Sequence, residues 1–283
     1  MLKKKNLFIL IIGYLFIGSS ALAFSISPLK YSAVMSPNSS KDWEVKITNN
    51  SNQASNFTSK VFGLKQDQQG RSVLEKNIDI AENWFKFPLN NITILPGETK
   101  TAIFNVEVPP NTPPGDHYLG LTIEEQGEGA LLAQLATALK LQIAGEAREK
   151  LVIENFSLNR KIFFDKKWLA QLQLRNAGNV ELNLAGQKNI FYFGKNIFEE
   201  RLNLGNNLFS QANRLAQLDL YPQEKMMWPG KYRADLKIKF GVTNQIVSTR
   251  IDFWYWPYWF MVILAGLLVL PFLFFRKKNH AVS

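Results

Sequence analysis

Residues 45–52 read VKITNNSN, and this stretch decides the fold because it joins an alternating strand to a turn rich in asparagine. Val45 and Ile47 fall on one side of such a strand, and Lys46 and Thr48 fall on the other. Alternation with a period of two is typical of a strand that has one buried face and one solvated face. Clusters of Asn and Ser between such segments mark turns. The stretch therefore predicts antiparallel β-structure.

The pattern occurs twice along the chain. A second strand with an Asn-rich turn, LQLRNAGN, occupies 172–179, and two Pro-Gly turns open alternating strands, PGDHYLGLTI at 114–123 and PGKYRADLKI at 229–238. Pro-Gly suits a tight turn because Pro fixes φ and Gly accepts positive φ. We expect Tyr118 and Tyr232, which follow these turns, to pack their rings on a core and to cap a loop with their hydroxyls. The repeat predicts two related immunoglobulin-like domains.

Short alternating strands at regular spacing indicate sandwiches or barrels. We predict an all-β ectodomain made of two immunoglobulin-like β-sandwich domains, 24–145 and 146–256, with the boundary after the apolar strand 138–144. A hairpin is expected within 188–209, with most of its aromatic rings in the core. The positions predicted to face the two cores are Trp43, Val45, Ile47, Ala102, Phe104, Val106, Val108, Ala170, Leu172, Leu174, Tyr232, Ala234, Leu236, Ile238 and Phe240.

The N-terminal segment has the layout of a secretory signal peptide. Lys3, Lys4 and Lys5 precede the apolar run 6–18, and the following residues end in Ala-Leu-Ala at 21–23. A basic start, a short apolar region and a small-residue cleavage site are the three parts of such a signal. We therefore predict a signal peptide over 1–23 and export of the rest, with an uncleaved signal anchor as the alternative.

The C-terminal segment predicts a membrane span. Residues 258–275 carry no charge, and as a helix they would measure roughly 27 Å, against a hydrocarbon core of about 30 Å. Aromatic residues over 253–259, among them Trp256 and Trp259, resemble an interfacial belt, and Arg276, Lys277 and Lys278 form a basic stop. We expect a single transmembrane helix at 257–275 and a cytoplasmic tail at 276–283. The alternative is a buried core helix.

Composition narrows the possible functions. Six of the 33 Lys and Arg residues lie in the signal and the basic stop, so the remainder nearly balances the 23 Asp and Glu, and no nucleic-acid footprint is visible. The chain has no cysteine, which excludes disulfides and thiolate chemistry. His117 is the single histidine of the ectodomain, and we read it as a turn residue. We therefore expect no catalytic residues, no metal, no cofactor and no enzyme activity.

The segment 127–137, GEGALLAQLAT, is apolar where sandwich loops are usually polar. We identify Leu131, Leu132 and Leu135 as candidate binding residues, because an exposed apolar patch tends to mark an interaction site. A loop that covers the core is the alternative.

The order of these motifs resembles a known bacterial group. ILPGET at 94–99, VPPNTPPGDHY at 108–118 and the NAGN turn precede the C-terminal apolar segment and its basic tail. This arrangement is similar to cell-surface proteins with immunoglobulin-like domains related to the WxL-interacting family. The resemblance implies a membrane-tethered surface protein whose first domain binds peptidoglycan or a surface protein.

The sequence thus favours a membrane-anchored binding or tethering protein of the bacterial envelope. Its partner would be an envelope or surface protein, or peptidoglycan. The alternative is a chaperone-like assembly factor for surface proteins that lends a strand edge by β-augmentation.

Overall fold

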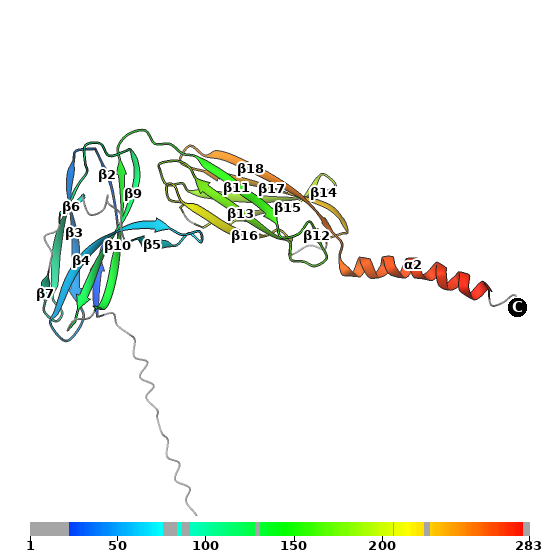
Figure 1. Cartoon of the computed structure of the whole chain (residues 1–283), viewed down its shortest axis with the longest axis horizontal. Helices are drawn as coiled ribbons and strands as arrows, with labels where there is room; N and C mark the ends of the chain where they lie inside the picture. Colours follow the sequence, from blue (N-terminus) through cyan, green and yellow to red (C-terminus); the bar gives the residue numbers. More distant parts are fainter. Residues whose placement is uncertain are drawn as a thin grey trace, which may run out of the picture.

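The structure is a computed structural model that describes residues 23–75, 84–86, 91–127, 131–205, 207–223 and 227–279, without the side chains of 270–279. It consists of two β-sandwiches followed by a helix (Figure 1). We refer to the sandwich built from 24–143 as domain 1 and to that built from 151–255 as domain 2. The prediction of an all-β fold with two immunoglobulin-like sandwiches is confirmed.

Domain 1 has two sheets. One has the order β1-β3-β8-β6, and the other has the order β2-β10-β9-β4-β5, with β7 also paired to β4. The strands are β1 (Phe24–Ser27), β2 (Lys30–Met35), β3 (Ser40–Asn49), β4 (Ser55–Gln66), β5 (Ser72–Glu75), β6 (Phe85–Lys86), β7 (Ile92–Ile94), β8 (Thr99–Glu107), β9 (Gly115–Gln126) and β10 (Leu131–Ile143).

The first strand of domain 1 is split between the two sheets. β1 pairs antiparallel with β3, and after Pro28 the chain crosses over so that β2 runs parallel to β10. Because β2 is short, it accompanies only part of the much longer β10. This mismatch in length shapes the site described below.

Domain 2 repeats this plan. Its sheets have the orders β11-β13-β16 and β12-β18-β17-β14-β15, and β12 again runs parallel to the strand beside it, β18. The strands are β11 (Leu151–Leu158), β12 (Ile162–Phe163), β13 (Leu169–Asn176), β14 (Leu184–Tyr192), β15 (Lys195–Leu202), β16 (Asn213–Asp219), β17 (Gly230–Phe240) and β18 (Gln245–Tyr255).

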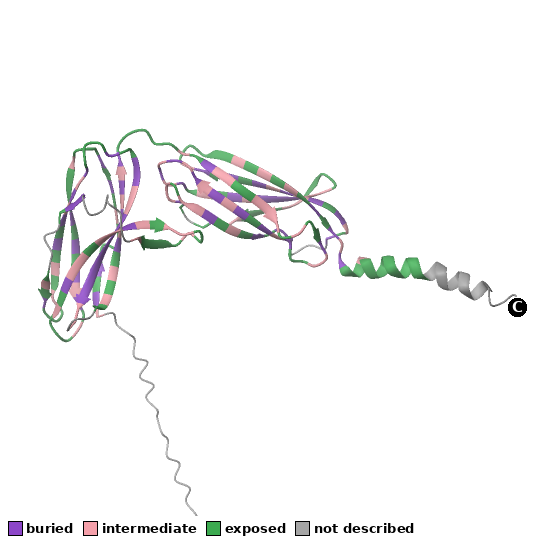
Figure 2. Ribbon diagram, viewed as in Figure 1, coloured by how far each residue is buried: buried purple, intermediate pink, exposed green. Residues whose placement is uncertain are grey.

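The predicted core positions are buried in both domains. Domain 1 packs around Trp43 and Phe104, and domain 2 packs around Trp168, a residue that the alternation did not single out. Along the strands, buried and exposed residues alternate, as Figure 2 shows. The sandwich facing predicted from the period of two is therefore confirmed.

The repeated Asn-rich turns share one buried residue. Asn49 and Asn176 end β3 and β13, and both are fully buried. The Asn49 amide donates to the carbonyls of Gln53 and Ile94, and the Asn176 amide donates to three carbonyls. A buried amide with this many backbone partners holds the loops that follow the strand.

Two predictions about aromatic residues are corrected in part. The hairpin exists as β14 and β15, and Tyr192 and Phe198 are partly buried against the core of domain 2, but Phe193 sits exposed at its tip and Phe209 packs between the domains. In the proposed interfacial belt, Phe253 and Tyr255 are buried in domain 2. Both belong to β18, whose alternation turns every second ring inward.

The C-terminal apolar segment is the helix α2 (Tyr258–Asn279), which projects from domain 2 (Figure 1). Its described side chains end at Val269, so Arg276, Lys277 and Lys278 lie outside them. A bilayer span needs about 20 apolar residues, and nowhere in the described part of the chain does a helix combine the length and the hydropathy for such a span. The predicted transmembrane helix is thus not supported. The signal peptide stays a prediction, because residues 1–22 lie outside the described residues.

Candidate functional site

The candidate site is an open edge of β10. This strand pairs with β9 along its whole length, from Leu131 to Ile143. On its other edge, β2 accompanies it only over 138–143. No strand among the described residues pairs with that edge over 131–137. We call these residues the open edge.

The backbone of the open edge offers unpaired polar groups. The N–H of Ala138 donates to the carbonyl of Leu29 at 3.0 Å, so even-numbered residues of β10 direct their N–H and C=O groups away from β9. By the same alternation, the backbone groups of Gln134 and Ala136 point to the unoccupied side. Exposed strand edges of this kind are templates for pairing with another chain.

The side chains at the start of β10 are apolar and accessible. Leu131 and Leu132 are 53% and 64% exposed, whereas Ala133 and Leu135 are half-buried and pack against the core of domain 1. A β-bulge between Leu131 and Ala133 interrupts the ladder here, so two neighbouring leucines reach solvent. The segment 127–137 is thus not a loop from 131 onward, as the sequence suggested, but the start of a long strand.

A polar cluster supports the open edge from β9. Glu124 is buried, and its carboxylate accepts from Lys60 at 2.6 Å and from the Gln134 amide at 3.2 Å. The neighbouring Glu125 accepts from the hydroxyl of Ser55 at 2.6 Å. These bonds link β10 to β9 and β9 to β4, so side-chain contacts as well as backbone pairing hold the sheet together beside the open edge.

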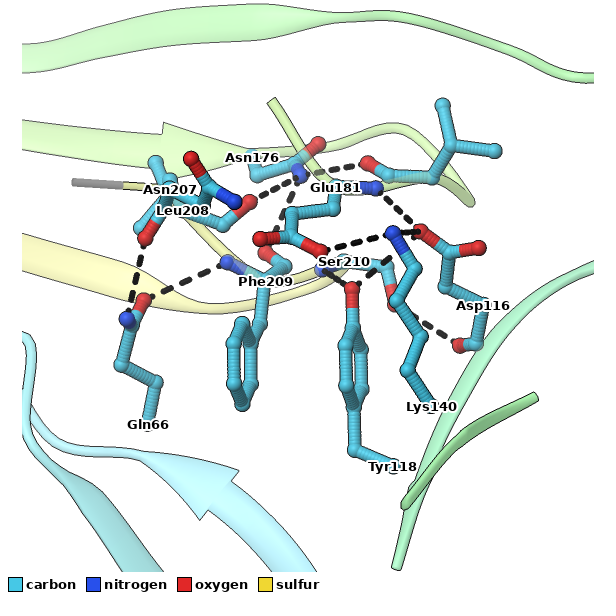
Figure 3. A network of polar contacts seen from close by, with 11 residues as sticks. Gln66, Asp116, Tyr118, Lys140, Asn176, Glu181, Asn207, Leu208, Phe209 and Ser210 are labelled. Atoms are coloured by element: carbon cyan, nitrogen blue, oxygen red, sulfur yellow. Dashed lines mark hydrogen bonds and ion pairs between the residues drawn. The ribbon is translucent and has the colours of Figure 1, made fainter. Parts of the chain in front are cut away.

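The other end of β10 is tied to domain 2 through Lys140. Its ammonium lies 2.9 Å from Asp116 of β9 and 2.7 Å from Glu181 of domain 2 (Figure 3). Burial would lower the pKa of Lys140, but the hydrogen bonds to Glu181 and Asp116 outweigh it and raise the pKa above its ordinary value. Lys140 is therefore a charged link between the domains.

An aromatic stack lies beside this link. The rings of Tyr118 and Phe209 are parallel, with centroids 3.9 Å apart, and they come from domain 1 and domain 2 (Figure 3). The Tyr118 hydroxyl donates to Asp116 at 3.3 Å and accepts from the N–H of Ser210 at 3.4 Å. Burial, followed by the charges of Asp116 and Glu181, raises the pKa of the Tyr118 phenol, so it stays neutral and can donate.

A third contact comes from the hairpin of β4 and β5, which reaches under domain 2 (Figure 1). The Gln66 amide donates to the carbonyl of Asn207 and accepts from the N–H of Phe209, and the Leu215 N–H donates to the carbonyl of Gln68 at 2.8 Å. Between the hairpin and the stack lies an open cleft of about 660 Å³. The domains are thus joined by several contacts, and β10 makes one of them through Lys140.

The titratable side chains of the described residues do not gather into a metal site, because no group of three His, Cys, Asp or Glu side chains among them is placed to hold a metal. His117 lies on β9, where its ring packs on Trp84 and its Nε2 lies 3.2 Å from the carbonyl oxygen of Pro113. The arrangement offers binding groups instead: a strand edge, apolar side chains and a charged link.

The structure therefore separates the residues proposed from the sequence. It places Leu131 and Leu132 at the surface of the open edge and Leu135 partly in the core, and it places Trp256 and Trp259 near the start of α2, remote from the edge. Sequence reasoning missed Lys140, Asp116 and Glu181. The Pro-Gly-Asp-His-Tyr motif contained a signal, because Tyr118 does cap with its hydroxyl, although across the domains.

Comparisons with known proteins give structures only. No family model and no curated protein match the chain. The class 5 fimbriae chaperone CfaA is 13% identical with a TM-score of 0.45, over 83% of this chain and 99% of that one. The CsuC–CsuE chaperone–tip subunit complex of Acinetobacter baumannii Csu pili is 14% identical with a TM-score of 0.39, over 82% of this chain and 99% of that one. The E. coli chaperone DraB is 11% identical with a TM-score of 0.36, over 82% of this chain and 95% of that one. The expected resemblance to the WxL-interacting family is wrong, because the similar structures include several fimbrial chaperones and the comparisons give no match to that family.

Proposed function

We propose that this protein is an assembly chaperone that lends the open edge of β10 to an exported, β-rich surface protein whose own sheet lacks a neighbouring strand. The observation that carries the proposal is the unpaired edge over 131–137, which bears two exposed leucines. Backbone hydrogen bonds along such an edge supply affinity, and alternate side chains supply specificity. The proposed function involves no chemical reaction, and the protein would bind its partner outside the cytoplasm.

The physical fit is specific to an incomplete sheet. Unpaired N–H and C=O groups in a partner are costly once they leave water. The open edge satisfies them while Leu131 and Leu132 cover apolar surface of the partner. Since Glu124 and its partners hold the neighbouring strands in place, little ordering is needed on the chaperone side.

A deletion strain complemented with variants tests this proposal. We expect the wild-type gene to restore the envelope level of one or more β-rich exported proteins, and Leu131→Ser combined with Leu132→Ser to restore much less. Ile103→Ser is the matched control, because Ile103 is a similarly exposed apolar residue of domain 1 on the other sheet. Quantitative proteomics of the envelope provides the measurement.

The same experiment distinguishes the tethering alternative. A tether would leave its partner folded and abundant in the deletion strain but released from the cell envelope. Equal restoration by the double variant and the control would contradict the role of the open edge.

A further inference from the structure

A second surface lies at the opposite end of domain 2, where the chain enters α2. Exposed aromatic side chains gather there from three separate segments. Phe193 at the tip of the β14–β15 hairpin is 78% exposed, Trp228 before β17 is 58% exposed, and Trp254 on β18 is 43% exposed. A ring exposed singly is ordinary, but several at one end of a domain mark an interaction surface.

Contacts show that these rings belong to one surface. The Tyr192 hydroxyl donates to the carbonyl of Pro229, which joins the hairpin tip to the turn that carries Trp228. Trp228 in turn packs edge-on against Trp259 of α2. Trp254 stacks on Trp256 just before the helix begins. We call this set of residues the aromatic rim.

The sheet face behind the aromatic rim is basic. An open hollow of about 510 Å³ is lined by Phe191, Lys231, Arg233, Arg250 and Trp254, with Asp252 as the carboxylate that lines it. Lys231 pairs with Asp252 at 3.1 Å, and Arg233 pairs with Asp235 and lies over the Phe191 ring. Among the described residues Arg250 forms no ion pair. The hollow therefore carries positive charge for an anionic ligand.

The helix adds an apolar surface in direct continuation. Val262, Leu267 and Leu268 of α2 are all exposed, and in Figure 2 the described part of the helix is uncovered. A ligand for the whole end of the domain must therefore present anionic groups beside apolar ones. A lipid surface combines both, and Trp side chains and basic residues are the groups that settle at its headgroups.

We propose that the α2-side end of domain 2 docks on an anionic lipid surface, with Phe193, Trp228 and Trp254 among the headgroups and Arg233 and Arg250 facing lipid phosphates. This contact is peripheral and does not depend on a membrane span. It is also independent of the open edge, which lies in domain 1.

Fluorescence quenching of the full chain tests the proposal. Because the chain has no cysteine, Lys195→Cys provides a single labelling position beside the hairpin tip, and Val242→Cys labels the exposed β17–β18 turn as a control. Vesicles of phosphatidylcholine, with or without phosphatidylglycerol, carry a nitroxide on some headgroups. We expect the label at 195 to lose most of its emission on vesicles with phosphatidylglycerol, and the label at 242 to keep it.

Charge variants make the result specific. Arg233→Gln with Arg250→Gln should weaken binding of the 195-labelled chain to anionic vesicles by roughly tenfold or more, since each basic residue near such a surface adds to the attraction. Lys237→Gln with Lys239→Gln removes the same charge from the same sheet face, but farther from the aromatic rim. This control should change the binding to anionic vesicles little. Quenching on neutral vesicles to the same extent, no quenching at 195, or equal loss in both double variants would overturn the proposal.

Discussion

At the scale of a single residue, Asn176 shows how much one buried amide can hold. Its amide group donates to the carbonyls of Val180, Leu208 and Phe209, and its oxygen accepts from the N–H of Gly178. Asn176→Ala leaves these groups without partners in the interior, so we expect a loss of about 2–4 kcal/mol in the free energy of unfolding. Asn155→Ala removes an exposed amide and should cost less than about 0.5 kcal/mol. Thermal and urea unfolding would measure both, and similar losses would contradict the role given to Asn176.

The sequence was most informative about which side chains of a strand point into the core and which point to solvent. The burial of Leu236 and the exposure of Lys237 follow from alternation alone, because successive side chains of a strand point to opposite faces. The partners of Lys140 could not be predicted in this way. Asp116 and Glu181 lie 24 and 41 positions away in the sequence; the pairing of β9 with β10 brings Asp116 close to Lys140, and the packing of the two domains brings Glu181.

At the scale of an element, β10 behaves differently along its two parts. Ala136→Pro removes an N–H that points to the unoccupied side, and proline is tolerated on such an edge. We expect a change in melting temperature of no more than a few degrees. Ala138→Pro removes the bond to Leu29 and should lower stability by about 1–3 kcal/mol. If both proline variants lower the melting temperature equally, the edge over 131–137 is not open as described.

Sequence analysis did not identify the first part of β10 as a strand, and the reason is physical. Residues 131–137 contain mostly small or apolar side chains on both faces, so the period of two disappears. A strand that ends at an open edge needs no polar outer face if a partner covers it. The absence of alternation thus coincides with the candidate site, and the local pattern alone read it as a loop.

At the scale of the whole molecule, Lys140 links the two domains. Lys140→Met leaves the buried Asp116 and the nearly buried Glu181 without their shared cation, so we expect a wider range of interdomain angles by small-angle X-ray scattering and a lower melting temperature. The raised pKa means that the link contributes fully below the ordinary lysine pKa of about 10.4 and is lost as pH rises through the higher folded value. The difference in stability between wild type and variant should therefore stay constant at neutral pH and shrink under strongly alkaline conditions. Lys237→Met, an exposed control, should show no such difference.

The short β2 has a further consequence for any strand that joins β10. The added strand would run alongside about 23 Å of backbone, at roughly 3.3 Å per residue, before it met Leu29 and Pro28. The Thr137 hydroxyl donates to the carbonyl of Pro28 at 3.1 Å, so this obstacle is fixed to β10 itself. A slip of one residue would turn every side chain of the incoming strand to the wrong face. In the proposed complex, the start of β2 would therefore stop the incoming strand and set its register, and partners would be distinguished by the length of strand they offer.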